Sequence, residues 1–248
     1  NGTAQFAIDV KLPGMVYATA LHAPVHTGSP ESWNNADIKK MPGVVGTVKL
    51  PNGVAVVAQH FEQAMAARNA LKGVWNKGTA AQFDSAKALE AYEKVHHDPK
   101  AQITNLMKKG DVDGAFASAA KKFHAEFRSD YGYHAQMEPL NAVASVAPGG
   151  DAVEIWAGTQ SQTTASEAPA KFLGISRDKV KLHDLLMGGG FGRRGNRDVD
   201  FIIDAVLMSK EAGRPVKVMW TREDDIANGR FRPISAHAVK AGFDQSGK

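Results

Sequence analysis

Five glycines stand within eight residues, Gly188 to Gly195, between a strand-like segment and a helix-like one. Residues 179–186 alternate apolar and polar side chains, as a strand does. Residues 199–206 then place apolar side chains at the spacing of one helix face, and Gly213 is positioned to end that helix. The strand and helix patterns together predict a mixed fold. Because glycine has no Cβ, a ligand could approach the backbone closely at the junction between them.

The junction is a candidate site for an anionic ligand. The first N–H groups of a helix are unpaired and lie at the positive end of its dipole. Arg193 and Arg194 add guanidinium groups, which bind phosphate through two parallel hydrogen bonds. A tight glycine turn without any ligand is the simpler interpretation. These residues alone leave both interpretations open.

A dinucleotide site is the third interpretation of the same residues. Gly190-x-Gly192-x-x-Gly195 has the spacing of the NAD(P)-binding fingerprint, with 216–220 as the next strand and Glu223 as the ribose-binding acid. Glu223 lies 28 positions after Gly195, however, whereas about 20 is usual in that motif. An NAD(P)-binding oxidoreductase built on Gly190–Gly195 is therefore an alternative hypothesis.

The first part of the chain is predicted to be a small α+β unit over residues 1–78. Residues 6–10 alternate like a strand, and 44–58 predict a hairpin about the Asn52–Gly53 step, which favours a tight turn. The Ala-rich segment 61–71 predicts a helix that Gly73 would end.

The rest of the chain is predicted to be a connecting arm over 79–122 and a second unit over 123–248. The arm is rich in Ala, Lys, Asp and Gly and contains a helix capped by Asp84. The second unit contains a hairpin over 141–156 and a helix that Gly174 would end.

Several short motifs, in order, resemble one protein family. They are His134–Pro139 (His-Ala-Gln-Met-Glu-Pro), Thr159–Gln160, Gly188–Gly192, Gly213–Lys217 and Trp220–Asp224. Together they resemble the cofactor domain of the xanthine dehydrogenase and aldehyde oxidase family of molybdenum hydroxylases. The arginines after Gly192 and the Gly-Arg-Phe-Arg-Pro sequence ending at Pro233 are most similar to the isoquinoline 1-oxidoreductase branch.

The resemblance implies an α+β fold: an α/β hammerhead domain over residues 1–78, followed by part of the molybdopterin-binding domain over 123–248. It implies hydroxylation of an aldehyde or N-heterocycle with oxygen from water. The cofactor would be a molybdenum–pterin, in the form of molybdopterin cytosine dinucleotide. The family's catalytic glutamate matches no residue of this chain, so we expect a fragment without a catalytic residue, inactive by itself.

The resemblance also implies which residues face the cofactor, none of them a direct ligand of the metal. Gln160 would hydrogen-bond an oxygen on molybdenum, and Phe191 and Gly192 would lie against the metal and the pterin. Gly189, Gly190, Arg193 and Arg194 would face the phosphate end. His134 and Glu138 match a family signature, and a structural role in the loop is favoured over catalysis because neither has a geometric partner in sequence.

The composition indicates which kinds of cofactor and partner the chain could bind by itself. The chain has no cysteine, so any iron–sulfur cluster must sit on a separate small subunit. The 30 Lys and Arg are spread along the chain against 26 acids, which does not favour nucleic-acid binding. No apolar run is long enough for a transmembrane segment. The compartment stays open between periplasm and cytoplasm, and a scaffold module without cofactor is a further alternative for the chain alone.

Overall fold

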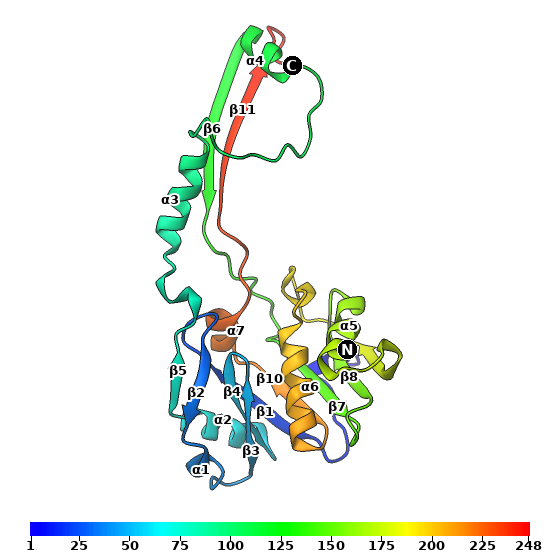
Figure 1. Cartoon of the computed structure of the whole chain (residues 1–248). Helices are drawn as coiled ribbons and strands as arrows, with labels where there is room; N and C mark the ends of the chain where they lie inside the picture. The colour runs from blue at the N-terminus through cyan, green and yellow to red at the C-terminus, as the bar shows by residue number, and fades with distance from the viewer. The chain divides into compact units, whose positions relative to one another are not determined.

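A computed structural model describes all of residues 1–248, which fold into two compact units (Figure 1). Unit 1 combines residues 1–82 with 133–230, and unit 2 combines 83–132 with 231–248. Each unit is therefore built from two separate stretches of the chain. None of the helices combines the length and apolar character that a bilayer crossing requires.

Unit 1 is organised around a mixed sheet of seven strands. In sheet order these are β3 (Val44–Leu50), β4 (Gly53–Ala58), β1 (Val16–His22), β10 (Val216–Met219), β7 (Asn141–Val146), β8 (Val153–Ala157) and β9 (Val180–Asp184). The β1–β10 and β8–β9 pairs are parallel, and the other pairs are antiparallel.

Helices cover both faces of this sheet. On one face α6 (Asp200–Ala212) contacts β7 and β10, beside α5 (Gln162–Leu173). On the other face α2 (Phe61–Asn69) contacts β1 and β4. Strand β4 is consequently buried along its whole length, as strands covered on both faces are.

The core divides between these two faces. Alternate residues of β4 point to opposite sides, so Ala55 and Val57 join the large cluster under α6, whereas Val54 and Val56 join a smaller one with Ile38. Beside the smaller cluster lie α1 (Asn35–Ile38) and the two-stranded sheet of β2 (Ser29–Trp33) and β5 (Gly73–Asn76). The remaining helix of unit 1, α7 (Arg222–Asn228), follows β10.

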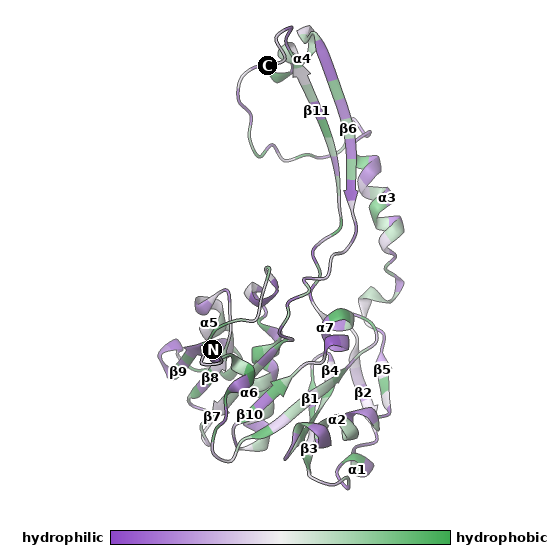
Figure 2. Ribbon diagram, turned by 180° about the vertical axis from the view of Figure 1, so that it is seen from behind, coloured by the Kyte–Doolittle hydropathy of each residue, from purple (hydrophilic) through white to green (hydrophobic).

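Unit 2 is a long antiparallel ribbon of β6 (Lys121–Ser129) and β11 (Ser235–Phe243). Hydrophilic and hydrophobic residues alternate along β6, as expected for a ribbon with one polar face (Figure 2). The helices α3 (Ser85–Val95) and α4 (Val112–Ser118) pack on β11. A two-stranded ribbon has marginal stability alone, and here both strands stay largely exposed although the helices contact them.

Local predictions about turns and caps are confirmed. The hairpins β3–β4 and β7–β8 form where the sequence predicts them. Gly174 and Gly213 end α5 and α6 with φ angles of 71° and 64°, and the Asp84 side chain caps α3 by accepting from Lys87 N at 3.1 Å. The mixed helix and strand fold is confirmed as well.

Two element predictions are wrong. Residues 7–9 form a short 3₁₀ helix rather than a strand, and only Phe6 bridges to Leu186. Helix α2 stops at Asn69, and Gly73 is the first residue of β5 instead of a helix cap.

The two units also differ from the predicted division at residues 78 and 122. Residues 1–78 do not form a sheet of their own, because β1 pairs in parallel with β10 from Val16↔Val216 onward. Most of the predicted arm joins β6 and β11 in unit 2. The hammerhead assignment of residues 1–78 stays a prediction.

Candidate functional site

The glycine loop lies beside Thr159–Gln160 because of the sheet's topology. Strands β8 and β9 are parallel neighbours, so their carboxyl ends meet at the same edge of the sheet. Thr159 and Gln160 follow β8, and the glycine loop, residues 186–195, follows β9. The Gln160 N–H and the Thr159 hydroxyl both donate to the Arg194 carbonyl, at 3.2 Å and 3.1 Å, which ties the two segments together.

The loop backbone is held in conformations that favour glycine. Gly189 and Gly192 have φ angles of 100° and 105°, and Phe191 between them has a φ of 52°. A positive φ at a phenylalanine is strained and persists only where neighbours enforce it. Phe191 is 67% exposed, so in this strained conformation its aromatic side chain faces solvent.

Gln160 is fixed against the loop through one end of its amide. Its Oε1 accepts from Gly192 N–H at 2.9 Å, which identifies the oxygen and leaves the Nε2 donor as the other end. A Cβ at Gly190 would lie 2.5 Å from this Oε1, so glycine at that position makes room for the amide. The structure thus brings Gln160, Gly189, Gly190, Phe191 and Gly192 together, and their role toward a cofactor stays a prediction.

Arg194 lies beneath the loop and is fully buried. Its Nε donates to the Gly189 carbonyl at 3.0 Å, and one terminal nitrogen donates to the Glu138 carboxylate at 3.0 Å and to the Glu138 carbonyl at 2.9 Å. The guanidinium therefore connects the loop to the segment that contains Glu138.

Arg193 is buried as well, at 1% exposure. It binds both carboxylate oxygens of Asp200 at 3.0 Å and 2.8 Å, and its guanidinium lies 5.6 Å from the centre of the Trp220 ring. The prediction that Arg193 and Arg194 would offer their side chains to a phosphate does not agree with this geometry. Carboxylates of the protein pair with the terminal nitrogens of both guanidinium groups, as buried cations require, and only the Arg193 Nε has no acceptor.

Sequence reasoning missed a buried polar network beside Arg194. Gln136 Nε2 donates to the Asp225 carboxylate at 2.8 Å, and burial raises the pKa of Asp225 to about 6. Glu138 accepts from Asn141 Nδ2 at 2.8 Å and from Gly188 N–H at 2.9 Å, which supports its structural role. The signal available in the sequence was the cluster of polar residues in 134–141, but their partners lie far away in the chain.

His134 lies next to the glycine loop, beside Gly192. A Cβ at Gly192 would be 3.6 Å from the His134 ring, so the imidazole and the loop backbone are near neighbours. His134 therefore shares the site with Gln160 through their common neighbour Gly192.

The geometry does not support a dinucleotide fold around Gly190–Gly195. Residues 193–195 form a 3₁₀ turn, and α6 begins only at Asp200, after Val199 with a φ of 39°. Strands β9 and β10 are separated by β7 and β8 in the sheet, whereas a nucleotide-binding βαβ unit joins neighbouring parallel strands. Glu223 lies in α7, within its first turn.

Comparison with known proteins identifies the fold and the family. The model of the molybdopterin cofactor-binding domain matches residues 95–248. The chain belongs to this family. The isoquinoline 1-oxidoreductase subunit beta of Brevundimonas diminuta is 35% identical over 247 residues, which cover 97% of this chain and 31% of that protein. The membrane-bound aldehyde dehydrogenase [pyrroloquinoline-quinone] of Gluconacetobacter polyoxogenes is 34% identical, over 99% of this chain and 32% of that protein.

Solved structures agree with the fold. Quinoline 2-oxidoreductase from Pseudomonas putida 86 superposes with a TM-score of 0.73 at 18% identity, over 98% of this chain and 36% of that one. CO dehydrogenase from Oligotropha carboxidovorans gives 0.74 at 18% identity, over 99% and 36%. The chain thus spans about a third of the length of its relatives and contains part of a molybdenum–pterin binding domain.

Proposed function

We propose that this chain is the part of a molybdenum hydroxylase large subunit that presents the glycine loop and Gln160 to a molybdenum–pterin cofactor. The full-length protein would hydroxylate an aldehyde or an N-heterocycle with oxygen from water. The observation that carries the proposal is the pairing of Gln160 with Gly192 in a chain of this family.

The residues at the loop fit such a cofactor. Gly192 is exposed and Gly189 half-buried, so the backbone is open there, and Phe191 adds an exposed aromatic side chain. The Gln160 amide has its oxygen committed to Gly192, so the end that remains for a ligand is an N–H donor. An uncharged donor suits an oxygen bound to a metal, because it orients that oxygen without competing as a ligand.

In the reaction the bound cofactor would supply the redox chemistry, accepting two electrons from the substrate. The chain's own residues would do the positioning. Gln160 would orient a cofactor oxygen through Nε2, and Phe191 would contribute an apolar surface that limits access of water. Arg194 would not touch the cofactor; it would hold Gly189 and Glu138 in place from inside the protein.

Finer features of the proposal rest on the similarity to the relatives. The cofactor would be molybdopterin cytosine dinucleotide, and the electrons would leave through iron–sulfur clusters on a small partner subunit, since this chain has no cysteine to bind one. The substrate class follows from two relatives, an isoquinoline 1-oxidoreductase subunit and an aldehyde dehydrogenase. The base that activates water would be supplied by residues outside this chain.

Isotope labelling of the full-length protein tests the reaction. The purified protein is incubated with benzaldehyde or isoquinoline, an artificial electron acceptor and ¹⁸O-labelled water, and the product is examined by mass spectrometry. We expect ¹⁸O in the carboxylate or lactam product, and no requirement for NAD(P). Turnover that depends on NAD(P), or product oxygen that comes from O₂, would contradict the proposal.

A further inference from the structure

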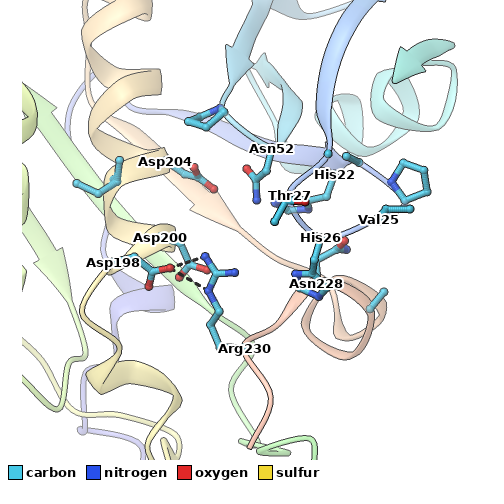
Figure 3. Close-up of a pocket in the computed structure, with 16 residues that line it drawn as sticks. His22, Val25, His26, Thr27, Asn52, Asp198, Asp200, Asp204, Asn228 and Arg230 are labelled. Atoms are coloured by element: carbon cyan, nitrogen blue, oxygen red, sulfur yellow. Dashed lines mark hydrogen bonds and ion pairs between the residues drawn. The ribbon is translucent and has the colours of Figure 1, made fainter. Parts of the chain in front are cut away.

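A cavity of about 460 Å³ opens on unit 1, and none of its lining residues belongs to the glycine loop. Its walls are the end of β1 with the following loop (22–28), the Pro51–Asn52 turn, the start of α6, and the end of α7 with Arg230. Figure 3 shows the Asp204 carboxyl and the Asn52 amide extending into the space between α6 and β1. The volume is within the range of small-molecule sites.

Three carboxyl groups line the cavity, and only two of them have a guanidinium partner. Asp198 accepts from Arg230 Nε at 2.9 Å, and Asp200 binds Arg193 through both oxygens. Each of these two carboxylates thus has its own guanidinium. Asp204 is only 6% exposed and has no hydrogen bond or ion pair within the chain. One carboxyl group is therefore left without a cation.

A second buried polar side chain in the cavity also lacks a partner. His22 is 7% exposed, neither ring nitrogen forms a hydrogen bond, and its ring lies 4.7 Å from that of Trp220. Burial lowers the pKa of His22 to about 4, so the imidazole is neutral and one nitrogen is an acceptor. The His22 nitrogens lie below the cavity surface, so His22 forms an uncharged wall. Buried polar groups in proteins are almost always hydrogen-bonded, so the unpartnered Asp204 carboxyl in the cavity wall points to an absent ligand.

We propose that this cavity binds one alkylammonium or guanidinium group, which pairs with Asp204 and donates a hydrogen bond to Asn52. Arg230 and Arg193 already pair with Asp198 and Asp200, so Asp204 is the one carboxyl group that a single monocation would pair with. The ligand is either a free organic amine or a Lys or Arg side chain of another protein segment. This inference is independent of the cofactor, because it rests on different residues.

The pKa of Asp204 is consistent with this assignment. Burial raises the pKa of Asp204 well above its ordinary value, and the carboxylates of Asp200 and Asp198 act in the same direction against the opposing charge of Arg193. The folded chain therefore favours the protonated form of Asp204 more than a free aspartic acid does. A cation that binds beside it favours the ionised carboxylate, so binding releases a proton.

Calorimetric titration of the chain with n-butylammonium chloride at pH 7 tests the proposal, with butan-1-ol as the neutral analogue. We expect saturable binding of the amine alone, with proton release that appears as a difference between buffers of unequal ionisation enthalpy. Asp204→Asn should weaken binding by at least about tenfold and remove the proton release. Asn52→Asp adds a carboxylate on the opposite wall and should tighten binding.

Asp178→Asn, at a fully exposed acid outside the cavity, is the matched control and should bind like the wild type. If the chain binds butylammonium but a longer form of the protein does not, a Lys or Arg side chain of that protein already fills the cavity. If both bind it, the natural ligand is a free amine. Equal binding by the wild type and Asp204→Asn, equal binding of butanol, or no saturable binding by the chain would overturn the inference.

Discussion

Replacing Arg194 by methionine tests whether the glycine loop is held from inside the protein. Arg194 is fully buried, and its guanidinium is 3.0 Å from the Glu138 carboxylate and 3.0 Å from the Gly189 carbonyl. Arg194→Met keeps the apolar stem but leaves a carboxylate of 8% exposure without its cation. Breaking a buried ion pair in this way costs about 3–5 kcal/mol of unfolding free energy.

For a chain of this length, about 2–4 °C of melting temperature corresponds to 1 kcal/mol, so Arg194→Met should melt about 6–20 °C lower. Circular dichroism during heating, with urea unfolding as a second measure, gives the shift. Arg197→Met is the matched control, because Arg197 is exposed, lies three positions away and makes no hydrogen bond or ion pair. It should melt within about 2 °C of the wild type.

The double variant Glu138→Gln with Arg194→Met removes both charges and should recover part of the loss. The reasoning is refuted if Arg194→Met unfolds with nearly wild-type stability while binding of phosphate compounds becomes weaker. In that case the guanidinium would be a ligand contact, as the sequence alone suggests, and not a support for the loop.

Two further predictions concern the loop and the polar network beside it. Gly190→Ala places a Cβ 2.5 Å from Gln160 Oε1 and should displace the amide. The full-length variant should then retain less than half of its molybdenum, measured by mass spectrometry. Gly195→Ala is the control and should retain the metal, because its Cβ would meet Gln160 at an ordinary 3.4 Å. Equal metal content in both variants would show that the position of Gln160 is unimportant. For Asp225, the pKa is raised from 3.8 in the unfolded chain to about 6 in the folded one, so its contribution to stability is complete below pH 3.8 and is lost as pH rises through 6. Urea unfolding should therefore show a smaller loss of stability between pH 4 and pH 7 in Asp225→Asn than in the wild type, and an unchanged pH dependence would contradict the assigned pKa.

Features set by neighbouring residues could be predicted from the sequence. The Asn52–Gly53 step specifies a hairpin by its own backbone preferences, and Gly174 and Gly213 end helices because they adopt a positive φ without strain. The meeting of Gln160 with the glycine loop was also predicted, through resemblance to a family. The hairpins and helix ends are confirmed, because their determining residues lie within a few positions, whereas the role of Gln160 toward a cofactor stays a prediction.

Features that depend on distant partners could not be predicted. The pairing of β1 with β10 joins Val16 to Val216, and no local pattern reports it. An arginine after a glycine run looks the same in sequence whether it faces a phosphate or a carboxylate, so the burial of Arg194 against Glu138 became visible only in the structure. Asp204 did leave a signal, because a carboxylate among the apolar residues of α6 is unusual in a helix that packs on a sheet.

Analysis of metal and pterin in the full-length protein tests the central claim most directly. The protein is purified without added cofactor, its molybdenum is measured by mass spectrometry, and the released pterin and nucleotide are identified after oxidation. We predict molybdenum and pterin in about equal amounts, close to one of each per large subunit, with cytidine monophosphate released from the cofactor. An active protein without molybdenum, or one that carries bound NAD(P) or pyrroloquinoline quinone in place of a pterin, would contradict the account.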